Sequence, residues 1–225
     1  MARYARSHGL REPIITPANM STETLTLHSP SRRTGWAAQA LGVLRLSFLV
    51  WAAVELAQGH TGDAIALVVT FAVLHVPWLL RLPLVFDVAF LVVWTLQELG
   101  QVAGFWGRFE WWDTLVHGAM PAVLAPTALL LLVRVDVLPN LFAARGTRAT
   151  IGAVMVVFLI AAGFGSVYEI YEWFADVHFG MHYQPDNTDT MTDITANAVG
   201  GLVGGLWLAA WARHAAVDGG RARTS

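Results

Sequence analysis

The chain has 225 residues, of which 56% are hydrophobic and only 13% charged, and its mean hydropathy is +0.52. A soluble globular domain carries roughly 25% charged residues, so this deficit predicts an outer surface that faces lipid. The net charge of −2 argues against a nucleic-acid partner, and the absence of cysteine excludes disulfides, thiolate metal sites and cysteine nucleophiles.

The first segment, residues 1–35, predicts a cytoplasmic tail without a packed core. It is polar, with scattered proline, serine, threonine and arginine, and shows no apolar period. A cleaved signal peptide would need an early apolar run followed by a small-residue cleavage site, and the first such run begins only near Trp36. We therefore expect this segment to be disordered and retained.

Six apolar stretches follow, each close to the roughly 20 residues that a helix needs to cross the hydrocarbon core of a bilayer. They cover residues 36–57, 63–80, 83–104, 112–133, 150–174 and 191–211. A membrane β-barrel would instead show alternating segments of about ten residues. The pattern predicts an all-α, polytopic membrane helix bundle over residues 36–213, followed by a second cytoplasmic tail at 214–225.

The distribution of arginine predicts the orientation, because short cytoplasmic loops carry an excess of basic residues. On one side of the predicted membrane, only Arg108 lies near the span ends. The other side holds Arg32, Arg33, Arg81, Arg134, Arg145, Arg148, Arg213, Arg221 and Arg223. We therefore expect both termini in the cytoplasm.

Polar side chains are concentrated where four of the predicted spans approach the extracytoplasmic side. They are Glu98 on the third span, Asp113 and His117 on the fourth, Glu169 and Glu172 on the fifth, and Asp189, Asp193 and Asn197 on the sixth. Residues three or four apart share a helix face, so the sets on the last three spans each form one stripe. Ionisable groups at membrane depth usually face the protein interior or a water-filled cavity, which predicts a shared site.

These residue types suit a metal site. A histidine with aspartate and glutamate oxygens can bind Zn²⁺, Mn²⁺ or Mg²⁺. A divalent ion would relieve the repulsion among the acids, as would protonation of some of them. The candidate ligands are Asp113, His117, Glu169, Glu172, Asp189 and Asp193. Glu169, Glu172 and His117 are also the candidate catalytic groups, with Asn197 and Glu98 as further polar members.

Structural explanations stay open for several of these residues. Asp113 and Asp189 lie at the starts of predicted helices. There an aspartate can cap free backbone amides, and its negative charge is favoured by the positive end of the helix dipole. Thr190 with Asp193 could form a capping box. Capping does not explain the two glutamates of the fifth span, which are predicted to lie at a helix C-terminus, where the dipole disfavours anions.

Other features favour a purely structural interpretation. The four glycines between residues 200 and 205 form small-xxx-small pairs that permit close helix packing. His178 and His182 are expected in the outer loop as solvated residues. Arg45 and Asp87 fall in the inner halves of the first and third spans, where an isolated charge is costly, so we expect a structural ion pair.

The stretches WTLQELG, WWDTLVHG, YEIYEW and DTMTD resemble the YjdF-like family of uncharacterised bacterial inner-membrane proteins. The segment DITANAVGGLVGG is similar to the DxxxNxxGxxxG ending of VanZ-like envelope proteins. The resemblance departs at Gln97-Glu98, where family members often have a His-Glu pair. It implies a bacterial cytoplasmic (inner) membrane location. It also marks as site residues Asp113, His117, Glu169, Glu172, Asp189, Asp193 and Asn197.

Three functions fit these expectations. The first is a metal-dependent enzyme at the outer leaflet, acting on a lipid or lipid-linked envelope substrate through activated water or a polarised phosphoryl or carbonyl group. The second is a cation- or proton-coupled transporter that uses the buried acids as a relay. The third is a non-catalytic envelope or assembly factor that binds a structural ion.

Overall fold

The computed structural model describes residues 35–139, 141 and 146–221. Its elements are α1 (Gly35–Ala57), α2 (Thr61–Val73), α3 (Val76–Leu79), α4 (Leu84–Gln101), α5 (Trp112–Arg134), α6 (Thr147–Phe179) and α7 (Asn187–Arg221). These described residues contain no strand, and with α2 and α3 taken together six helices are long and apolar enough to cross a membrane. The predicted all-α fold with six membrane-length helices is therefore confirmed.

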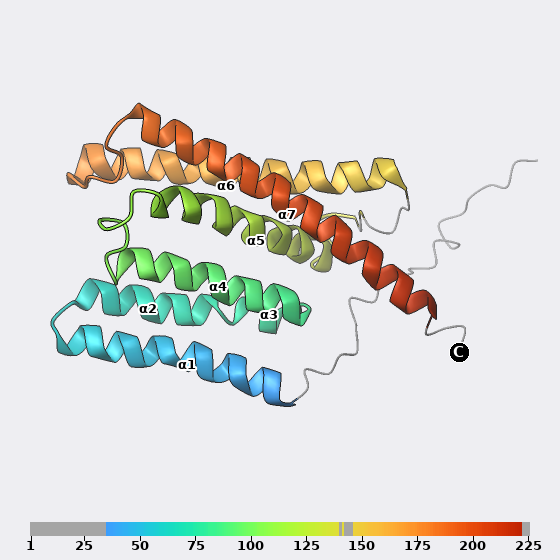
Figure 1. Ribbon diagram of the computed structural model, residues 1–225, viewed down its shortest axis with the longest axis horizontal. Coiled ribbons are helices and arrows are strands. Elements are labelled where there is room, and N and C mark those ends of the chain that lie inside the picture. The colour runs from blue at the N-terminus through green and yellow to red at the C-terminus, as the bar shows by residue number, and fades with distance from the viewer. Residues whose placement is uncertain (1–34, 140, 142–145, 222–225) are drawn as a thin grey trace, which may run out of the picture.

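The helices lie side by side and alternate in direction along the chain (Figure 1). α1 packs on α2, and α2 also contacts α4. The other three long helices, α5, α6 and α7, pack on one another, and α4 joins the two groups through α5. The starts of α5 and α7 and the end of α6 consequently meet at one end of the bundle (Figure 1).

Apolar side chains cover both the interior and the outward faces of the bundle. One buried cluster includes Phe86, Leu129, Leu130, Val157 and Leu208. Exposed apolar residues of the outward faces include Val43, Leu46, Val50 and Val54 of α1 and Leu159, Phe164 and Val167 of α6. Helices that are apolar all round are typical of membrane spans, so this distribution fits a lipid environment.

Two glycines of α7 allow this helix to approach α5 closely. A Cβ at Gly200 would collide with the backbone of Gly118, and one at Gly204 with the backbone of Ala122. Pro126 has no N–H to donate to the Ala122 carbonyl four residues earlier, so that carbonyl lacks its normal helical partner. The predicted close packing of this span is present, and its partner is α5.

A buried ion pair joins α1 to α4, and a hydrogen bond from the same arginine reaches the end of α2. Arg45 of α1 bonds the carboxylate of Asp87 on α4, and its Nε donates to the Leu74 carbonyl at a distance of 3.0 Å. Leu74 follows the end of α2, which stops at Val73 because Pro77 has no N–H for the Val73 carbonyl. The predicted Arg45–Asp87 contact is present, whereas the break in the second span was not foreseen.

The last two helices are longer than the predicted spans. α6 continues to Phe179 and ends at Gly180, whose φ of 65° is left-handed. The prediction that Glu169 and Glu172 lie at a helix C-terminus is therefore wrong, and His178 lies in α6 rather than in a loop. α7 continues to Arg221, so most of the segment predicted as a tail at 214–225 is helical; residues 1–34 of the other predicted tail lie outside the described residues.

Candidate functional site

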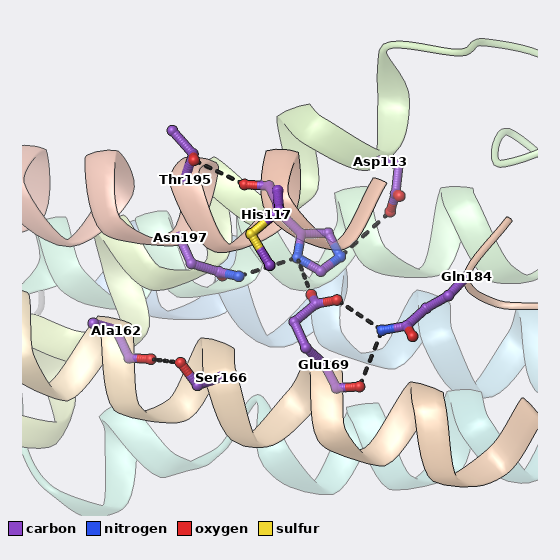
Figure 2. Close-up of polar contacts among 9 residues, drawn as sticks. Asp113, His117, Ala162, Ser166, Glu169, Gln184, Thr195 and Asn197 are labelled. Carbon is purple, nitrogen blue, oxygen red and sulfur yellow. Dashed lines mark hydrogen bonds and ion pairs between the residues drawn. The ribbon is translucent and has the colours of Figure 1, made fainter. Parts of the chain in front are cut away.

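His117 is the centre of the cluster, and both of its ring nitrogens face carboxylates. Its Nε2 lies 3.4 Å from Oδ1 of Asp113, one turn earlier on α5. Its Nδ1 lies 3.5 Å from Oε1 of Glu169 on α6 (Figure 2). The imidazole is only 8% exposed. An imidazole between two carboxylates can bind a cation, accept a proton or carry a positive charge.

Asn197 brings α7 to the same imidazole. Its Nδ2 lies 3.2 Å from Nδ1 of His117, and the side chain is buried (Figure 2). Gly165 of α6 makes room for it, because a Cβ there would collide with the Asn197 side chain. Gly165 was not predicted as a site residue, since a glycine in an apolar helix gives no sign of which neighbour it accommodates.

Two sets of ligand-type atoms meet at His117. Single ligand atoms of Asp113, His117 and Asp193 all lie within 4.8 Å of one another, and so do those of His117, Glu169 and Glu172. Carboxylate oxygens and imidazole nitrogens are ligands that Zn²⁺ and Mn²⁺ accept, and the oxygens also suit Mg²⁺. The shared site predicted from helix stripes thus brings five residues of three helices together.

Two carboxylate oxygens in these sets are buried without a hydrogen bond. They are Oε1 of Glu169 and Oδ2 of Asp193, on side chains that are 4% and 2% exposed. In the described part of the chain no arginine pairs with either residue. A buried charge is costly without a partner, so these oxygens need a cation or a proton, and for Oε1 of Glu169 a proton on His117, 3.5 Å away, would also serve.

The segment between α6 and α7 folds back onto the cluster through Gln184. The Gln184 side-chain amide donates to Oε2 and to the backbone carbonyl of Glu169, at 2.9 and 3.0 Å (Figure 2). Asp176 of α6 holds this segment by accepting the backbone amides of Tyr183 and Gln184 at 2.8 and 2.9 Å. Gln184 was missed because a loop residue has no helical periodicity that could mark its direction.

The cap of α7 is Asp186 rather than Asp189. Its Oδ1 accepts the backbone amides of Thr188 and Asp189 at 2.7 and 3.1 Å. Hydrogen bonds from the amides of Asp189 and Thr188 lower the pKa of Asp186. The side chain of Asp189 is half-buried beside the cluster, but it belongs to neither set of ligand-type atoms.

The other capping alternatives also fail. Asp113 lies in the first turn of α5, yet the start of that helix has no side-chain cap bond. α7 begins at Asn187, so Thr190 with Asp193 lies inside the helix and is no capping box. Asp113 and Asp193 are therefore available to the cluster.

Glu98 does not join the His117 cluster. It is buried on α4, accepts a hydrogen bond from Thr70 of α2, and belongs to neither set of ligand-type atoms around His117. The prediction that it shares the site is therefore not supported, since helix depth alone does not say which neighbour a side chain meets. Its second oxygen, Oε2, is buried without a hydrogen bond.

A third set of ligand-type atoms lies at the turn between α1 and α2. It consists of Glu55, His60 and Asp63. This set was not predicted, although a histidine and two acids flank a tight turn in the sequence. His60 is exposed and its Nδ1 bonds Glu55 at 2.8 Å, while Trp51 donates to the same carboxylate at 2.9 Å. These bonds account for this set without a ligand. Neither His178 nor His182 is in any of the three sets.

One family model matches residues 37–214, which include every residue of the cluster. Its description is "Predicted membrane protein (DUF2238)". The chain belongs to this family. Membership in the DUF2238 family agrees with the six membrane-length helices and leaves the chemistry of the cluster to be argued from its geometry. No curated protein and no solved structure matches the chain.

Proposed function

We propose that this membrane protein binds a divalent cation (Zn²⁺, Mn²⁺ or Mg²⁺) at the His117 cluster and acts as a metal-dependent enzyme on a lipid or lipid-linked envelope substrate. The observation that carries the proposal is the convergence of ligand-type side chains from three helices with two buried carboxylate oxygens that have no hydrogen bond. A cation bound in the cluster satisfies a buried oxygen that has no hydrogen bond and offsets the repulsion among the acids.

The residues divide into two roles. Glu169 is held by Gln184, so it suits a fixed role as ligand. Glu172 is half-buried and makes no hydrogen bond to the described residues, so one of its oxygens can act as a general base while the other stays available as a ligand. The cation would supply Lewis-acid activation of water or of a phosphoryl or carbonyl oxygen.

Two observations support an envelope substrate: the distribution of arginine between the two ends of the bundle, and the YjdF-like and VanZ-like motifs of the sequence. Arg134 ends α5 and Arg148 lies at the start of α6, at the opposite end of the bundle from the cluster (Figure 1). If this end faces the cytoplasm, as the excess of arginine favours, the cluster faces the outer leaflet. The YjdF-like motifs favour a bacterial inner membrane, and the VanZ-like segment of the last helix favours an envelope role.

Glu98 favours a second candidate, a cation- or proton-coupled transporter. Its buried Oε2 has no hydrogen bond, and buried acids of membrane helices often serve in proton relays. A relay would need to continue toward the other end of α1, α2 and α4. There, however, the buried charges of Arg45 on α1 and Asp87 on α4 are already paired with each other. We therefore rank the enzyme first.

Metal analysis tests the proposal. The detergent-purified chain should retain bound Zn²⁺ or Mn²⁺ after loading and desalting, and His117→Ala should lose it. His182→Ala is the matched control, because this histidine lies outside the three sets. A wild-type chain without bound ion would overturn cation binding. For the enzyme, the loaded chain should change components of an envelope lipid extract, read by mass spectrometry, and His117→Ala should not. Bound metal without turnover would leave a structural ion in a non-catalytic factor.

A further inference from the structure

We infer that the His117 cluster holds two divalent cations, one on each side of the imidazole ring, rather than one. This inference rests on the proposed cation binding and goes beyond it in number and arrangement. The first position is formed by Asp113, Asp193 and His117, whose Nε2 faces Asp113. The second is formed by Glu169, Glu172 and His117, whose Nδ1 faces Glu169.

The geometry of the imidazole separates the two positions. The lone pairs of its two nitrogens lie in the ring plane and point away from each other, so one ion cannot be bound by both. Asp113 faces Nε2 at 3.4 Å and Glu169 faces Nδ1 at 3.5 Å. An ion bound to one nitrogen therefore takes ligands from one set and leaves the carboxylates of the other set unbalanced.

Each set contains its own buried oxygen without a hydrogen bond. In the first set it is Oδ2 of Asp193, and in the second it is Oε1 of Glu169. The four carboxylates of the two sets carry four negative charges when ionised, so a single divalent ion leaves two of them unbalanced, whereas two ions with a deprotonated imidazole ring leave one. Protonation of one pair would be the alternative, and it predicts a single bound ion.

Asn197 does not block the second position. Its amide lies 3.2 Å from Nδ1, and a side-chain amide can present either its nitrogen or its oxygen after a flip. Binding at both nitrogens displaces the ring N–H proton of neutral His117 to solvent. Uptake of the second ion should therefore release a proton and weaken as the pH falls.

The stoichiometry of binding tests the inference. The full chain in detergent, stripped with a chelator and titrated with Zn²⁺ in a calorimeter, should bind two ions, and metal analysis should give the same ratio. Asp193→Asn should leave one ion, Glu172→Gln should leave one, and the double variant none. Glu110→Gln is the matched control, because this glutamate is exposed and outside all three sets. Far-ultraviolet circular dichroism verifies that each variant keeps its helices.

Electron paramagnetic resonance of the chain loaded with Mn²⁺ tests whether the two ions lie close to each other. Two Mn²⁺ ions at neighbouring positions broaden each other's signals, and each single variant should restore the sharp signal of an isolated ion. One ion per wild-type chain that either single variant abolishes would overturn the two-cation inference and leave the proposed function intact. No ion in the wild type would overturn the proposed function itself. Loss of an ion in His60→Ala would place the second ion at the α1–α2 turn, and this too would overturn the inference.

Discussion

Arg45 and His117 are both buried polar residues, but their surroundings differ in the balance of charge. Arg45 meets one carboxylate, Asp87, and one backbone carbonyl, so its charge is balanced locally. His117 is surrounded by acids and by the amide of Asn197. The first arrangement balances its own charge, whereas the second is an anionic cluster that the proposed cation would balance.

The Arg45–Asp87 pair predicts an asymmetry between single and double variants. Arg45→Ala alone should lower the free energy of unfolding by about 3–5 kcal/mol, because it leaves a buried carboxylate without its cation. The double variant Arg45→Ala/Asp87→Ala should lose less than the single variant, because it leaves no charge behind. Thermal unfolding in detergent measures both, and a double variant that is less stable than Arg45→Ala would contradict a structural pair.

Gln184 is predicted to tune the cluster without binding the cation. Gln184→Ala removes both hydrogen bonds to Glu169, so that carboxylate loses its fixed orientation. Residues that hydrogen-bond to metal ligands typically contribute roughly 10- to 100-fold to metal affinity. We therefore expect Gln184→Ala to lower the affinity for Zn²⁺ by about 10-fold or more. Competition with a chelator measures the affinity, with His182→Ala as a control in the same segment. Unchanged affinity would show that Glu169 needs no support.

At the level of helices, the close approach of α7 to α5 positions the cluster. The small-xxx-small spacing of the α7 glycines was readable from the sequence, and it correctly predicted a tight contact. Which helix they contact was not readable, because glycine carries no side chain that identifies a partner. The length of α6 was also missed, since the apolar segment after Trp173 continues the helix without a stop signal until Gly180.

A methyl group at Gly204 should separate α7 from α5. Gly204→Ala places a Cβ against the Ala122 backbone, and overpacking of this kind costs about 1–3 kcal/mol of stability. Gly163→Ala is the matched control, because a Cβ there has no neighbour within 4 Å. The thermal midpoint in detergent should fall for the first variant only. Equal midpoints for the two variants would mean that the helices adjust at little cost.

The first turn of α7 should depend on pH through Asp186. Because folding lowers the pKa of Asp186, its cap stabilises the turn above the ordinary aspartate pKa of about 3.9 and is lost as the pH falls through the lowered value. Asp186→Ala should speed amide exchange in residues 187–190 at pH 7. Asp186→Asn should keep the cap at pH 7 and remove its loss in acid. Exchange in Asp186→Ala equal to wild type would contradict this assignment.

For the molecule as a whole, the position of the polar residues along the helices could be predicted from sequence, while the neighbours that they meet on other helices could not. Hydropathy locates each predicted span, and positions near the span ends put His117 and Glu169 at one level, while helical periodicity grouped the polar residues of each span on one face. Glu98 lies at the same predicted level, yet it bonds Thr70 in the other group of helices. Lateral neighbours depend on side-chain packing between helices, and one sequence does not encode that in a readable pattern.

The orientation can be tested directly because the chain has no cysteine. A single cysteine at Gly107 or Pro185 should react with a membrane-impermeant maleimide added to intact cells, because both positions lie at the cluster end. Cysteines at Arg148 and Arg213 should react only after permeabilisation, since arginine favours the cytoplasmic side. Labelling of Arg148 in intact cells would place the cluster in the cytoplasm and exclude an outer-leaflet substrate.

The length of α6 determines where the carboxylates of the cluster lie relative to the hydrocarbon core of the membrane. Its 33 residues extend about 50 Å at 1.5 Å per residue, well beyond a hydrocarbon core of about 30 Å. Glu169 lies about 33 Å from the start of this helix at Thr147, so a bilayer that covers the apolar first part of α6 leaves Glu169 among the lipid headgroups. A lipid could thus present its polar end to the cluster while its chains stay dissolved in the leaflet.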